Sequence, residues 1–279
     1  MFLQAKRVKV RDVDVHYLEA GEGNRPTVVL LHGLGSGSGA WRYNIPHLAR
    51  RFRVIAPDMP GFGDSQPGEA IGEYTAAAMT GFLAEFMSAL GLERAHVVGW
   101  SLGGGVAASM ALDHPDVVER LVLVAPAAIG DQVHVIFRLL ALPFVGEYLL
   151  RPSRAATERL TKTLMVYDPE RAPEDIIDYH HSLSLNPWTR ETTLRIVRRN
   201  GVLWWGQRRQ KLGSRLAEIA SPTLVIWGRY DRILPVGHAE ILRRLVPEVK
   251  VEIFEDCGHS PPFEYPDEFN ALVEKFLSS

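Results

Sequence analysis

Ser101, in the segment Gly99-Trp100-Ser101-Leu102-Gly103, is the residue of this sequence best placed for covalent chemistry. A serine hydroxyl is a poor nucleophile until a neighbouring base takes its proton, and that base needs a third group to hold its tautomer. Asp231, Asp256 and His259 follow later in the chain, each just past an apolar run. A serine, a histidine and a carboxylate that meet in space would support attack on a carbonyl carbon.

The residues around Ser101 predict a strand, a sharp turn and a helix. Residues 96–98 end an apolar run whose β-branched side chains favour a pleated strand. The glycines at 103–105 are expected to allow a turn too tight for any residue with a Cβ. From Val106 the residues are good helix formers, and His114-Pro115 ends the pattern because the residue before a proline avoids the helical region. The serine is therefore predicted at the corner between a buried strand and a helix.

The rest of the sequence alternates strand and helix patterns. Residues 6–20 alternate apolar and polar side chains, which predicts an antiparallel hairpin at a sheet edge. Residues 74–90 carry apolar side chains at helical spacing and are followed by Gly91. Runs that are apolar on both faces predict inner strands at residues 27–33, 53–58, 120–126, 222–228 and 249–255. This order predicts a mostly parallel sheet covered by helices on both faces.

Residues 127–213 break this alternation. They show helical patterns interrupted by prolines, and no strand pattern of the same quality. A helical excursion between two strands of one sheet is most simply an insertion over the carboxyl ends of the strands, where open α/β sheets bind ligands. The sequence therefore predicts a first core part at residues 1–126, a helical cap at 127–213 and a second core part at 214–279.

The composition is that of an ordinary globular protein. With 279 residues, 46% of them hydrophobic and 23% charged, the chain can bury a core of its own. A formal charge of −2 argues against nucleic acid as a partner, because nucleic-acid-binding domains carry a basic excess. The single cysteine, Cys257, cannot form an internal disulfide and suits a reducing compartment. The first twelve residues hold no apolar stretch of signal-peptide length, so a soluble, cytoplasmic protein is expected.

The strand, corner and helix around Ser101 resemble the nucleophile elbow of the α/β-hydrolase superfamily. The resemblance implies an α/β fold with an eight-stranded, mostly parallel, doubly wound sheet and a helical cap inserted after strand 6. In that family the catalytic residues follow the order serine, acid, histidine, each on a loop after a strand. The resemblance therefore implies Ser101 as nucleophile, Asp231 as acid and His259 as base. Asp256 remains a rival acid, although it lies at the end of the histidine's own strand.

The resemblance also implies an oxyanion hole formed by the backbone N–H groups of Leu34 and Leu102. Leu102 follows the nucleophile, and Leu34 lies in the glycine-rich stretch after an earlier strand. A flexible Gly/Ser loop is the alternative explanation for that stretch. Four residues beside these groups are expected to contact the substrate: Gly33, Gly35, Trp100 and Ser260.

The serine at the elbow separates this chain from haloalkane dehalogenases and epoxide hydrolases, which use an aspartate there. Residues 133–150 are almost wholly apolar and are expected to pack on the core and line an acyl pocket. The leading hypothesis is therefore a cofactor-free carboxylesterase or small lipase that cleaves esters with apolar acyl chains through an acyl-enzyme. A perhydrolase or an acyltransferase would use the same residues with a different acceptor.

Two alternatives stay open. Residues 164–182 resemble the cap segment of carbon–carbon bond hydrolases that act on ring-fission products. Those enzymes have asparagine, arginine and tryptophan where this chain has Trp100, His180 and Ser260, so an acidic dienone would lose its bidentate cation. The second alternative is a non-catalytic ligand receptor on the same fold, a kind of protein that often loses a triad member.

No cofactor or metal is expected. Asp58 and Asp64 flank a glycine-rich loop that is a structural turn in family members. His180 and His181 are adjacent, so on a helix their side chains would point about 100° apart, which does not suit one metal ion. Cys257 is not expected to act as a nucleophile, because the histidine near it is already assigned to Ser101.

The segment 190–215 is strongly basic, with Glu191 as its one acidic residue. Its basic residues are Arg190, Arg195, Arg198, Arg199, Arg208, Arg209, Lys211 and Arg215. A solvated helix face is the ordinary explanation, and weak contact with an anionic membrane surface through the cap is the alternative, since Trp204-Trp205 lies in the same segment. The expected partner is otherwise a small-molecule ester.

Overall fold

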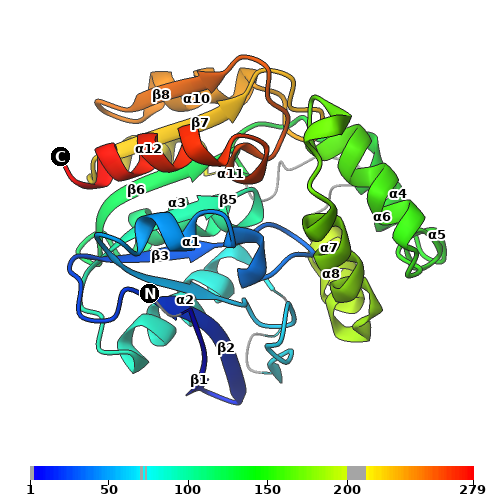
Figure 1. Ribbon diagram of the computed structural model, residues 1–279, viewed down its shortest axis with the longest axis horizontal. Helices are drawn as coiled ribbons and strands as arrows, with labels where there is room; N and C mark the ends of the chain where they lie inside the picture. The colour runs from blue at the N-terminus through cyan, green and yellow to red at the C-terminus, as the bar shows by residue number, and fades with distance from the viewer. Residues whose placement is uncertain (1–2, 70–71, 73, 200–211) are drawn as a thin grey trace.

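A single eight-stranded sheet forms the centre of the computed structural model, which describes residues 3–69, 72, 74–199 and 212–279 (Figure 1). The strands are β1 Gln4–Val10, β2 Val13–Ala20, β3 Thr27–Leu31, β4 Arg53–Pro57, β5 Ala95–Trp100, β6 Val118–Val124, β7 Thr223–Gly228 and β8 Lys250–Phe254. Their spatial order is β1-β2-β4-β3-β5-β6-β7-β8. The pairs β1–β2 and β2–β4 are antiparallel, and every pair from β4 to β8 is parallel. The predicted sheet is confirmed, with the predicted hairpin at its edge.

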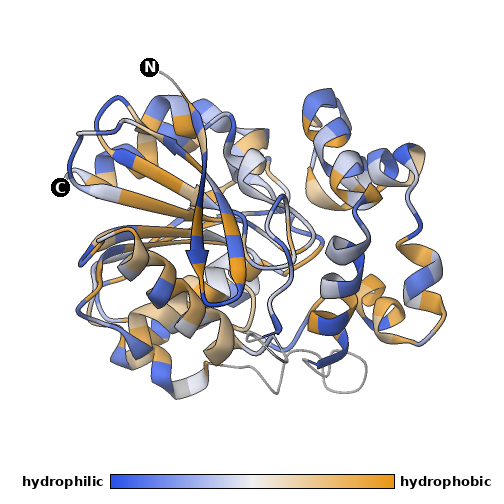
Figure 2. Cartoon of the chain, turned by 90° about the horizontal axis from the view of Figure 1, so that it is seen from below, coloured by the Kyte–Doolittle hydropathy of each residue, from blue (hydrophilic) through white to orange (hydrophobic). Residues whose placement is uncertain are grey.

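Helices cover both faces of this sheet, which explains why its inner strands are mostly apolar. In β3, Val29 and Leu31 belong to the core beneath α2, α3 and α10, whereas Val28 and Leu30 belong to the core beneath α1 and α12. Figure 2 shows the strands of the sheet as mostly hydrophobic. The core helices are α1 Ile45–Leu48, α2 Ala76–Ala89, α3 Leu102–Asp113, α10 Gly237–Leu245, α11 Pro261–Glu264 and α12 Pro266–Leu277, with 3-10 turns at η1 Ser38–Trp41 and η6 Gly213–Glu218.

A group of helices between β6 and β7 forms the cap and lies beside the carboxyl ends of the strands (Figure 1). Its elements are α4 Val135–Ala141, α5 Val145–Leu149, α6 Arg154–Leu160, the π-turn η3 Thr161–Met165, the 3-10 turn η4 Pro169–Arg171, α7 Glu174–Leu185 and α8 Pro187–Arg199. The described part of this segment contains no strand, as expected. The division of the chain at residues 126 and 213 stays a prediction.

Within the ranges that the structure describes, no helix combines the length and the apolar character needed to cross a bilayer. The cytoplasmic location expected from the sequence stays a prediction.

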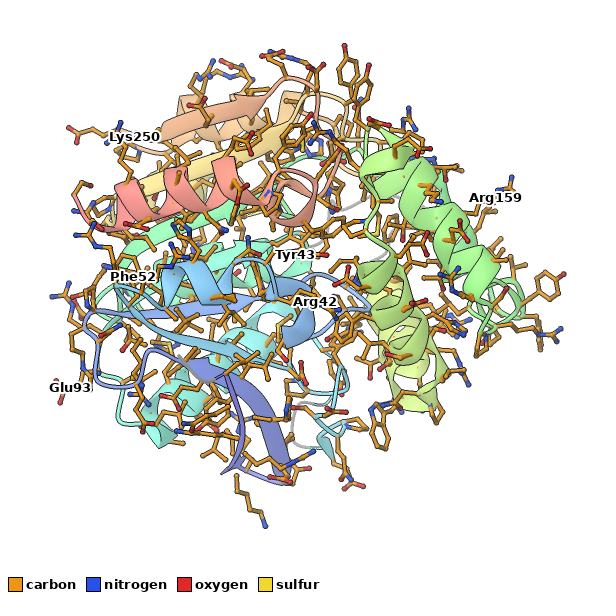
Figure 3. All side chains as sticks on the ribbon, viewed as in Figure 1. Arg42, Tyr43, Phe52, Glu93, Arg159 and Lys250 are labelled. Atoms are coloured by element: carbon orange, nitrogen blue, oxygen red, sulfur yellow. The ribbon has the colours of Figure 1, made fainter. Side chains whose placement is uncertain are left out.

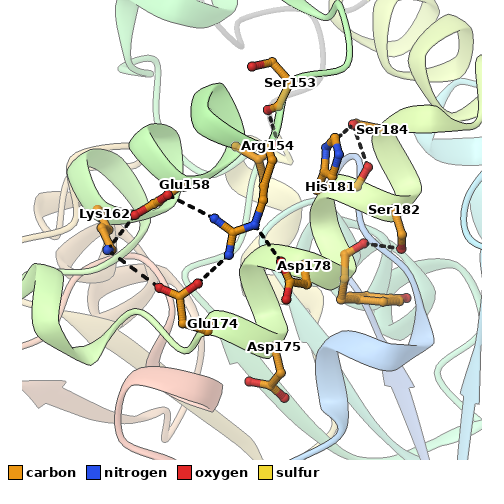
Figure 4. A network of polar contacts seen from close by, with 12 residues as sticks. Ser153, Arg154, Glu158, Lys162, Glu174, Asp175, Asp178, His181, Ser182 and Ser184 are labelled. Atoms are coloured by element: carbon orange, nitrogen blue, oxygen red, sulfur yellow. Dashed lines mark hydrogen bonds and ion pairs between the residues drawn. The ribbon is translucent and has the colours of Figure 1, made fainter.

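Helix α6 is held against the rest of the cap by charge. None of its residues is buried. Arg154 donates to Glu158 on its own helix at 3.1 Å, and to Glu174 and Asp178 on α7 at 2.5 and 2.8 Å (Figure 4). Lys162 donates to Glu158 at 2.8 Å and joins the same network. A single exposed ion pair contributes little to stability, so the shared partners are what give this attachment its strength.

The apolar segment 133–150 packs only in part, and the expectation that it lies on the core is wrong for about half of its side chains. Leu140 and Ala141 are buried against Val197 of α8. Phe144 is 87% exposed and Tyr148 is 64% exposed. An apolar run has the same sequence pattern whether it is covered, faces a cavity or faces solvent, so the sequence could not distinguish these cases.

The corner at Ser101 has the predicted order of elements but a different physical basis. Helix α3 begins at Leu102 rather than at Val106, and the residue with a positive φ is Ser101 itself, at φ 56° and ψ −114°. The glycines at 103–105 lie inside the helix and have no positive φ. A Cβ at Gly103 would lie within 3.0 Å of backbone atoms of β3. The expected glycine turn is therefore wrong, because these glycines serve the close packing of α3 on the sheet.

Gly99 provides a test of this packing, because a Cβ there would lie within 3.0 Å of the backbone of Gly103 and of the side chain of Ala107. We expect Gly99→Ala to lower the free energy of unfolding by about 1–3 kcal/mol, since the helix must move away from β5. Gly81 in α2 is the matched control, because a Cβ there meets nothing within 4 Å. Gly81→Ala should raise the free energy of unfolding by about 0.5–1 kcal/mol. Denaturant titration measures both, and equal effects of the two substitutions would contradict the packing argument.

Candidate active site

The carboxyl ends of β3 and β5 lie side by side at the point where the strand order reverses. The chain passes from β3 to β4 on one side of it and then to β5 on the other. Open α/β sheets bind their ligands at such a switch point. The loop after β3 holds Gly33 to Gly35, and β5 ends at Trp100, directly before Ser101. A cavity of about 250 Å³ lies between these residues and the cap.

Asp231 and His259 form a buried pair at this cavity. His259 Nδ1 donates to Asp231 Oδ2 at 2.7 Å, because an ionised carboxylate can only accept. The backbone N–H groups of Ile233 and Leu234 donate to Asp231 Oδ1 at 2.8 and 2.9 Å. Trp227 Nε1 donates to Oδ2 at 3.0 Å. These donors hold the carboxylate in place against the imidazole ring, which suits a group that orients a base.

Asp256, the rival acid, occupies a different environment. Its side chain is exposed, and its backbone carbonyl accepts a hydrogen bond from Tyr265 Oη at 2.9 Å. No hydrogen bond between its carboxylate and His259 occurs among the described contacts. The geometry therefore favours Asp231 over Asp256 as the partner of the histidine.

The loops that carry Asp231 and His259 are in close backbone contact at Gly228. A Cβ on Gly228 would lie within 3.0 Å of the carbonyl oxygens of Cys257 and Gly258. Any larger residue at position 228 would force the two loops apart. The hydrogen bond between His259 and Asp231 therefore depends on the close backbone contact at Gly228 as well as on the two side chains.

Glu264 supports the histidine loop from behind, and the sequence analysis missed it. Its carboxylate accepts from the backbone N–H of Gly258 at 2.8 Å and of Tyr167, in the cap, at 2.7 Å. Burial raises the pKa of Glu264, although these donors oppose that shift. Burial, together with the nearby charge of Glu264, also raises the pKa of the Cys257 thiol, so the thiol stays protonated. No sequence signal marks Glu264, because a single glutamate is ordinarily exposed.

Ser101 and His259 line the same cavity. The described contacts contain no hydrogen bond between Ser101 Oγ and the imidazole, and catalytic hydrogen bonds are often long before a substrate binds. The backbone N–H groups of Leu34 and Leu102 likewise donate to no described group. Leu34 lines the cavity, and Leu102 is the first residue of α3, whose amide has no acceptor within the helix. Both amides are therefore available as donors beside the serine.

Three of the four residues expected to contact the substrate line the cavity, namely Gly33, Gly35 and Trp100. Trp100 Nε1 donates to the carbonyl oxygen of His259 at 2.9 Å, so its ring is fixed against the loop that carries His259. Ser260 is fully buried, precedes the short helix α11 and is absent from the described lining of the cavity. This placement gives no support to a contact between Ser260 and a substrate.

The cap supplies an apolar wall to the cavity. Its side chains include Ile136, Phe137, Leu140, Leu149, Leu150 and Leu160. All but the last belong to the segment 133–150, so the expected apolar lining from this segment agrees with the structure. The wall suits a substrate with an apolar body.

His180 faces the same cavity from α7. A hydrogen bond of 3.1 Å joins its Nε2 to Ser36 Oγ. Burial lowers the pKa of His180 to about 4, and the nearby positive charges of Arg42 and His32 act in the same direction. The imidazole is therefore neutral at neutral pH. Where the carbon–carbon bond hydrolases have an arginine on the cap, this chain therefore has a neutral side chain that can form hydrogen bonds.

Polar contacts fasten α7 to the core. Arg42 Nη1 donates to Asp175 Oδ2 at 3.1 Å, and Tyr43 Oη donates to the other oxygen of that carboxylate. The backbone N–H of Gly39 donates to Tyr179 Oη at 3.0 Å. Figure 3 labels Arg42 and Tyr43 at this junction of core and cap. These contacts hold α7, and with it the cap residues that face the cavity, against the segment that follows β3.

Asp58 has the structural role expected of it. It accepts hydrogen bonds from the backbone N–H groups of Ser38 and Asp64 and from His16 Nδ1, the last at 2.7 Å. Burial alone would raise the pKa of Asp58, but the hydrogen bond from His16 and its other partners hold it below its usual value. Potential ligand atoms of His16, Asp58 and Asp64 lie within 4.8 Å of one another. Both oxygens of Asp58 already accept hydrogen bonds from these protein groups.

The basic segment 190–215 is described only in part. Three of its arginines form ion pairs: Arg195 with Glu191, Arg198 with Glu147 and Arg215 with Asp113. Arg208, Arg209, Lys211 and Trp204-Trp205 lie outside the described residues. Contact of the cap with a membrane surface therefore stays a prediction.

The comparisons with known proteins agree on one family. A family model described as alpha/beta hydrolase fold matches residues 26–266. The 2-hydroxy-6-oxo-6-phenylhexa-2,4-dienoate hydrolase of Comamonas testosteroni is 31% identical over 284 residues, which cover 99% of this chain and 95% of that protein. The dihydrolipoyllysine-residue acetyltransferase component of the acetoin cleaving system of Cupriavidus necator is 35% identical over 269 residues, which cover 95% of this chain and 68% of that protein.

Among solved structures, a meta-cleavage product hydrolase from Pseudomonas fluorescens IP01 is similar over almost the whole chain. The match has a TM-score of 0.84 and 29% sequence identity, and it covers 98% of this chain and 97% of that one. Core and cap are therefore both within the matched region.

The lowered pKa of His180 predicts a pH dependence of stability. The unfolded chain takes up this proton near pH 6.5, whereas the folded protein takes it up only near pH 4, so acid favours unfolding across that window. Between pH 7 and pH 5 we expect the protein to lose about 1–2 kcal/mol more of its unfolding free energy than the His180→Gln variant. Glutamine can keep a hydrogen bond to Ser36 without titrating. Denaturant titrations at both pH values measure the difference, and parallel losses in the two proteins would show that His180 is not held neutral by the fold.

Proposed function

The chain belongs to the α/β-hydrolase family, and from this premise we propose that it is a serine hydrolase that cleaves esters of apolar carboxylic acids. The observation that carries the proposal is the buried hydrogen bond of 2.7 Å between His259 Nδ1 and Asp231 Oδ2, at a cavity that Ser101 also lines. The apolar wall supplied by the cap supports an apolar acyl group. A non-catalytic receptor would have no need of an oriented base beside a serine.

The proposed reaction begins when a bound ester brings its carbonyl carbon to Ser101 Oγ. His259 Nε2 takes the hydroxyl proton as the new C–O bond forms, and the imidazolium is stabilised by Asp231. The negative charge on the carbonyl oxygen is received by the N–H groups of Leu34 and Leu102. His259 then gives the proton to the departing alkoxide oxygen, and the alcohol leaves behind an acyl-enzyme.

Water completes the proposed cycle by the same route. His259 takes a proton from the water as its oxygen attacks the acyl carbon, and the bond to Ser101 Oγ breaks as the proton passes back to the serine. The carboxylic acid is released and the enzyme returns to its starting state. An acceptor other than water would make the same site an acyltransferase, which is the kind of activity in the name of the Cupriavidus necator relative.

Carbon–carbon bond cleavage is the second candidate, and the comparisons favour it more strongly than ester hydrolysis. The Comamonas testosteroni relative is named as a dienoate hydrolase, and the matching structure is a meta-cleavage product hydrolase. Against it stand Trp100, His180 and Ser260, where the corresponding enzymes have asparagine, arginine and tryptophan. His180 is neutral, so it does not supply the charge of the arginine, and Ser260 is buried and absent from the described lining of the cavity.

A direct comparison of substrates separates the two candidates. p-Nitrophenyl esters of graded acyl length and a dienone ring-fission product should be assayed side by side with the wild type and with Ser101→Ala. We expect the higher kcat/KM on the esters and loss of their cleavage in Ser101→Ala, because the other hydroxyl groups that line the cavity belong to the cap and not to the loops that carry His259 and Asp231. A higher kcat/KM on the dienone would transfer the proposal to carbon–carbon cleavage, and no turnover of either class would leave the receptor hypothesis.

Asp231 and Asp256 allow a matched test of the acid. Asp231→Asn should lower kcat roughly 10⁴-fold, because an amide stabilises neither the required tautomer nor the imidazolium. Asp256→Asn makes the same chemical change on an exposed carboxylate and should leave kcat within a factor of about two. Steady-state kinetics on the best ester, with circular dichroism as a check of folding, measures both. A large loss in Asp256→Asn with little loss in Asp231→Asn would exchange their roles.

A further inference from the structure

Two arginines of the cap are shared between the inner cavity and a groove on the outside of the cap. Arg151, between α5 and α6, and Arg190, on α8, line the cavity that holds Ser101. Both also line an outer groove of about 460 Å³. They therefore lie where the apolar cavity meets the outside of the cap, at a wall formed by helices and not by the catalytic loops.

The other two arginines that line the outer groove form ion pairs with carboxylates, whereas Arg151 and Arg190 do not among the described residues. Among its lining residues, Arg195 pairs with Glu191 and Arg198 pairs with Glu147. Arg151 lies 4.9 Å from the centre of the Tyr148 ring, and Arg190 Nη1 donates to the backbone carbonyl of Ser184 at 2.8 Å. No carboxylate pairs with either arginine among the described residues. The two that border the cavity are thus the two whose charge is not neutralised.

Thr189 adds an independent observation. It precedes Arg190 on α8, lines the cavity and is only 3% exposed. Its Oγ1 has no hydrogen-bond partner among the described residues. A buried hydroxyl without a partner is costly, and its cost is removed when a ligand accepts or donates there. Thr189 and Arg190 of α8 therefore add a hydroxyl and a guanidinium group to the cavity wall, which Arg151 also lines.

We propose that Arg151, Arg190 and Thr189 form a subsite for an anionic group of the substrate, remote from the bond that is cleaved. Guanidinium groups bind carboxylate and phosphate through charge-assisted, often bidentate, hydrogen bonds. The preferred substrate then has three parts: a carbonyl at Ser101, an apolar body along the cap wall and an anion at the arginines. The inference rests on the proposed serine hydrolase and names its substrate class.

A purely structural role for Arg190 makes a different prediction. Its bonds to the carbonyls of Ser184 and Leu185 place it at the carboxyl end of α7, where it satisfies backbone acceptors. Such a role would change stability and would affect charged and neutral substrates alike. Selectivity between two substrates that differ only in charge therefore distinguishes the subsite from the helix end.

The kinetic test uses pairs of p-nitrophenyl esters of dicarboxylic acids, one with the far carboxyl free and the other with it methylated. We expect the wild type to prefer the free acid in kcat/KM, chiefly through KM. Arg190→Gln and Arg151→Gln should each lower the ratio of free acid to methyl ester roughly tenfold or more, as expected for a lost hydrogen bond to a charged group. Arg190→Lys should restore part of it. Arg195→Gln is the matched control, because Arg195 is already paired, and its ratio should stay that of the wild type.

Binding to Ser101→Ala tests the subsite without turnover. Calorimetry should compare the monomethyl ester of a dicarboxylic acid, which keeps one carboxylate, with the neutral dimethyl ester and with an alkyl phosphate of similar length, so that carboxylate and phosphate are distinguished. Thr189→Val, which keeps the shape of the side chain, should weaken the binding of the preferred anion severalfold. Charge-selective binding with no ester turnover would overturn the proposed function and leave the subsite standing. Equal binding and equal turnover of charged and neutral partners would overturn the subsite and leave the hydrolase.

Discussion

The hydrogen bond between His259 Nδ1 and Asp231 Oδ2 is the interaction on which the site depends. Both side chains are buried, so the loss of either would leave a polar group away from water without its partner. The bond also requires two distant loops to touch, which Gly228 permits because it has no side chain. Trp227 and Glu264 then secure one loop each. The hydrogen bond between the two side chains and the packing of their loops therefore depend on each other.

The sequence was sufficient to predict the parts of the fold that repeat a simple pattern. Strands covered on both faces carry apolar side chains on both, as the runs at residues 28–31, 97–98, 121–124 and 224–227 show. The carboxyl ends of parallel strands share one edge, so residues that follow β5, β7 and β8 had to meet there. This is why Ser101, Asp231 and His259 could be selected together, although no local pattern marks Asp231 by itself.

Other features depend on contacts that no local pattern records. The glycines after Ser101 were expected to form a turn, and only the distance between α3 and β3 shows that they permit close packing. Phe144 is exposed although its segment is as apolar as a core strand. Ser260 directly follows the base yet is buried behind it, because backbone direction decides which neighbour faces the cavity. The arginines at 151 and 190 are far apart in sequence, so their shared position required the tertiary structure.

Helix α6 shows that part of the cap is attached by charge and not by a hydrophobic core. Its place on α7 is set by pairs of opposite charges, without any buried side chain. A segment attached in this way can be lengthened, shortened or exchanged without repacking a hydrophobic interior. The lining that α6 gives to the cavity can consequently change while the loops that carry Ser101, Asp231 and His259 stay as they are. Chains with this arrangement can therefore keep the same site and differ in the shape of the cavity beside it.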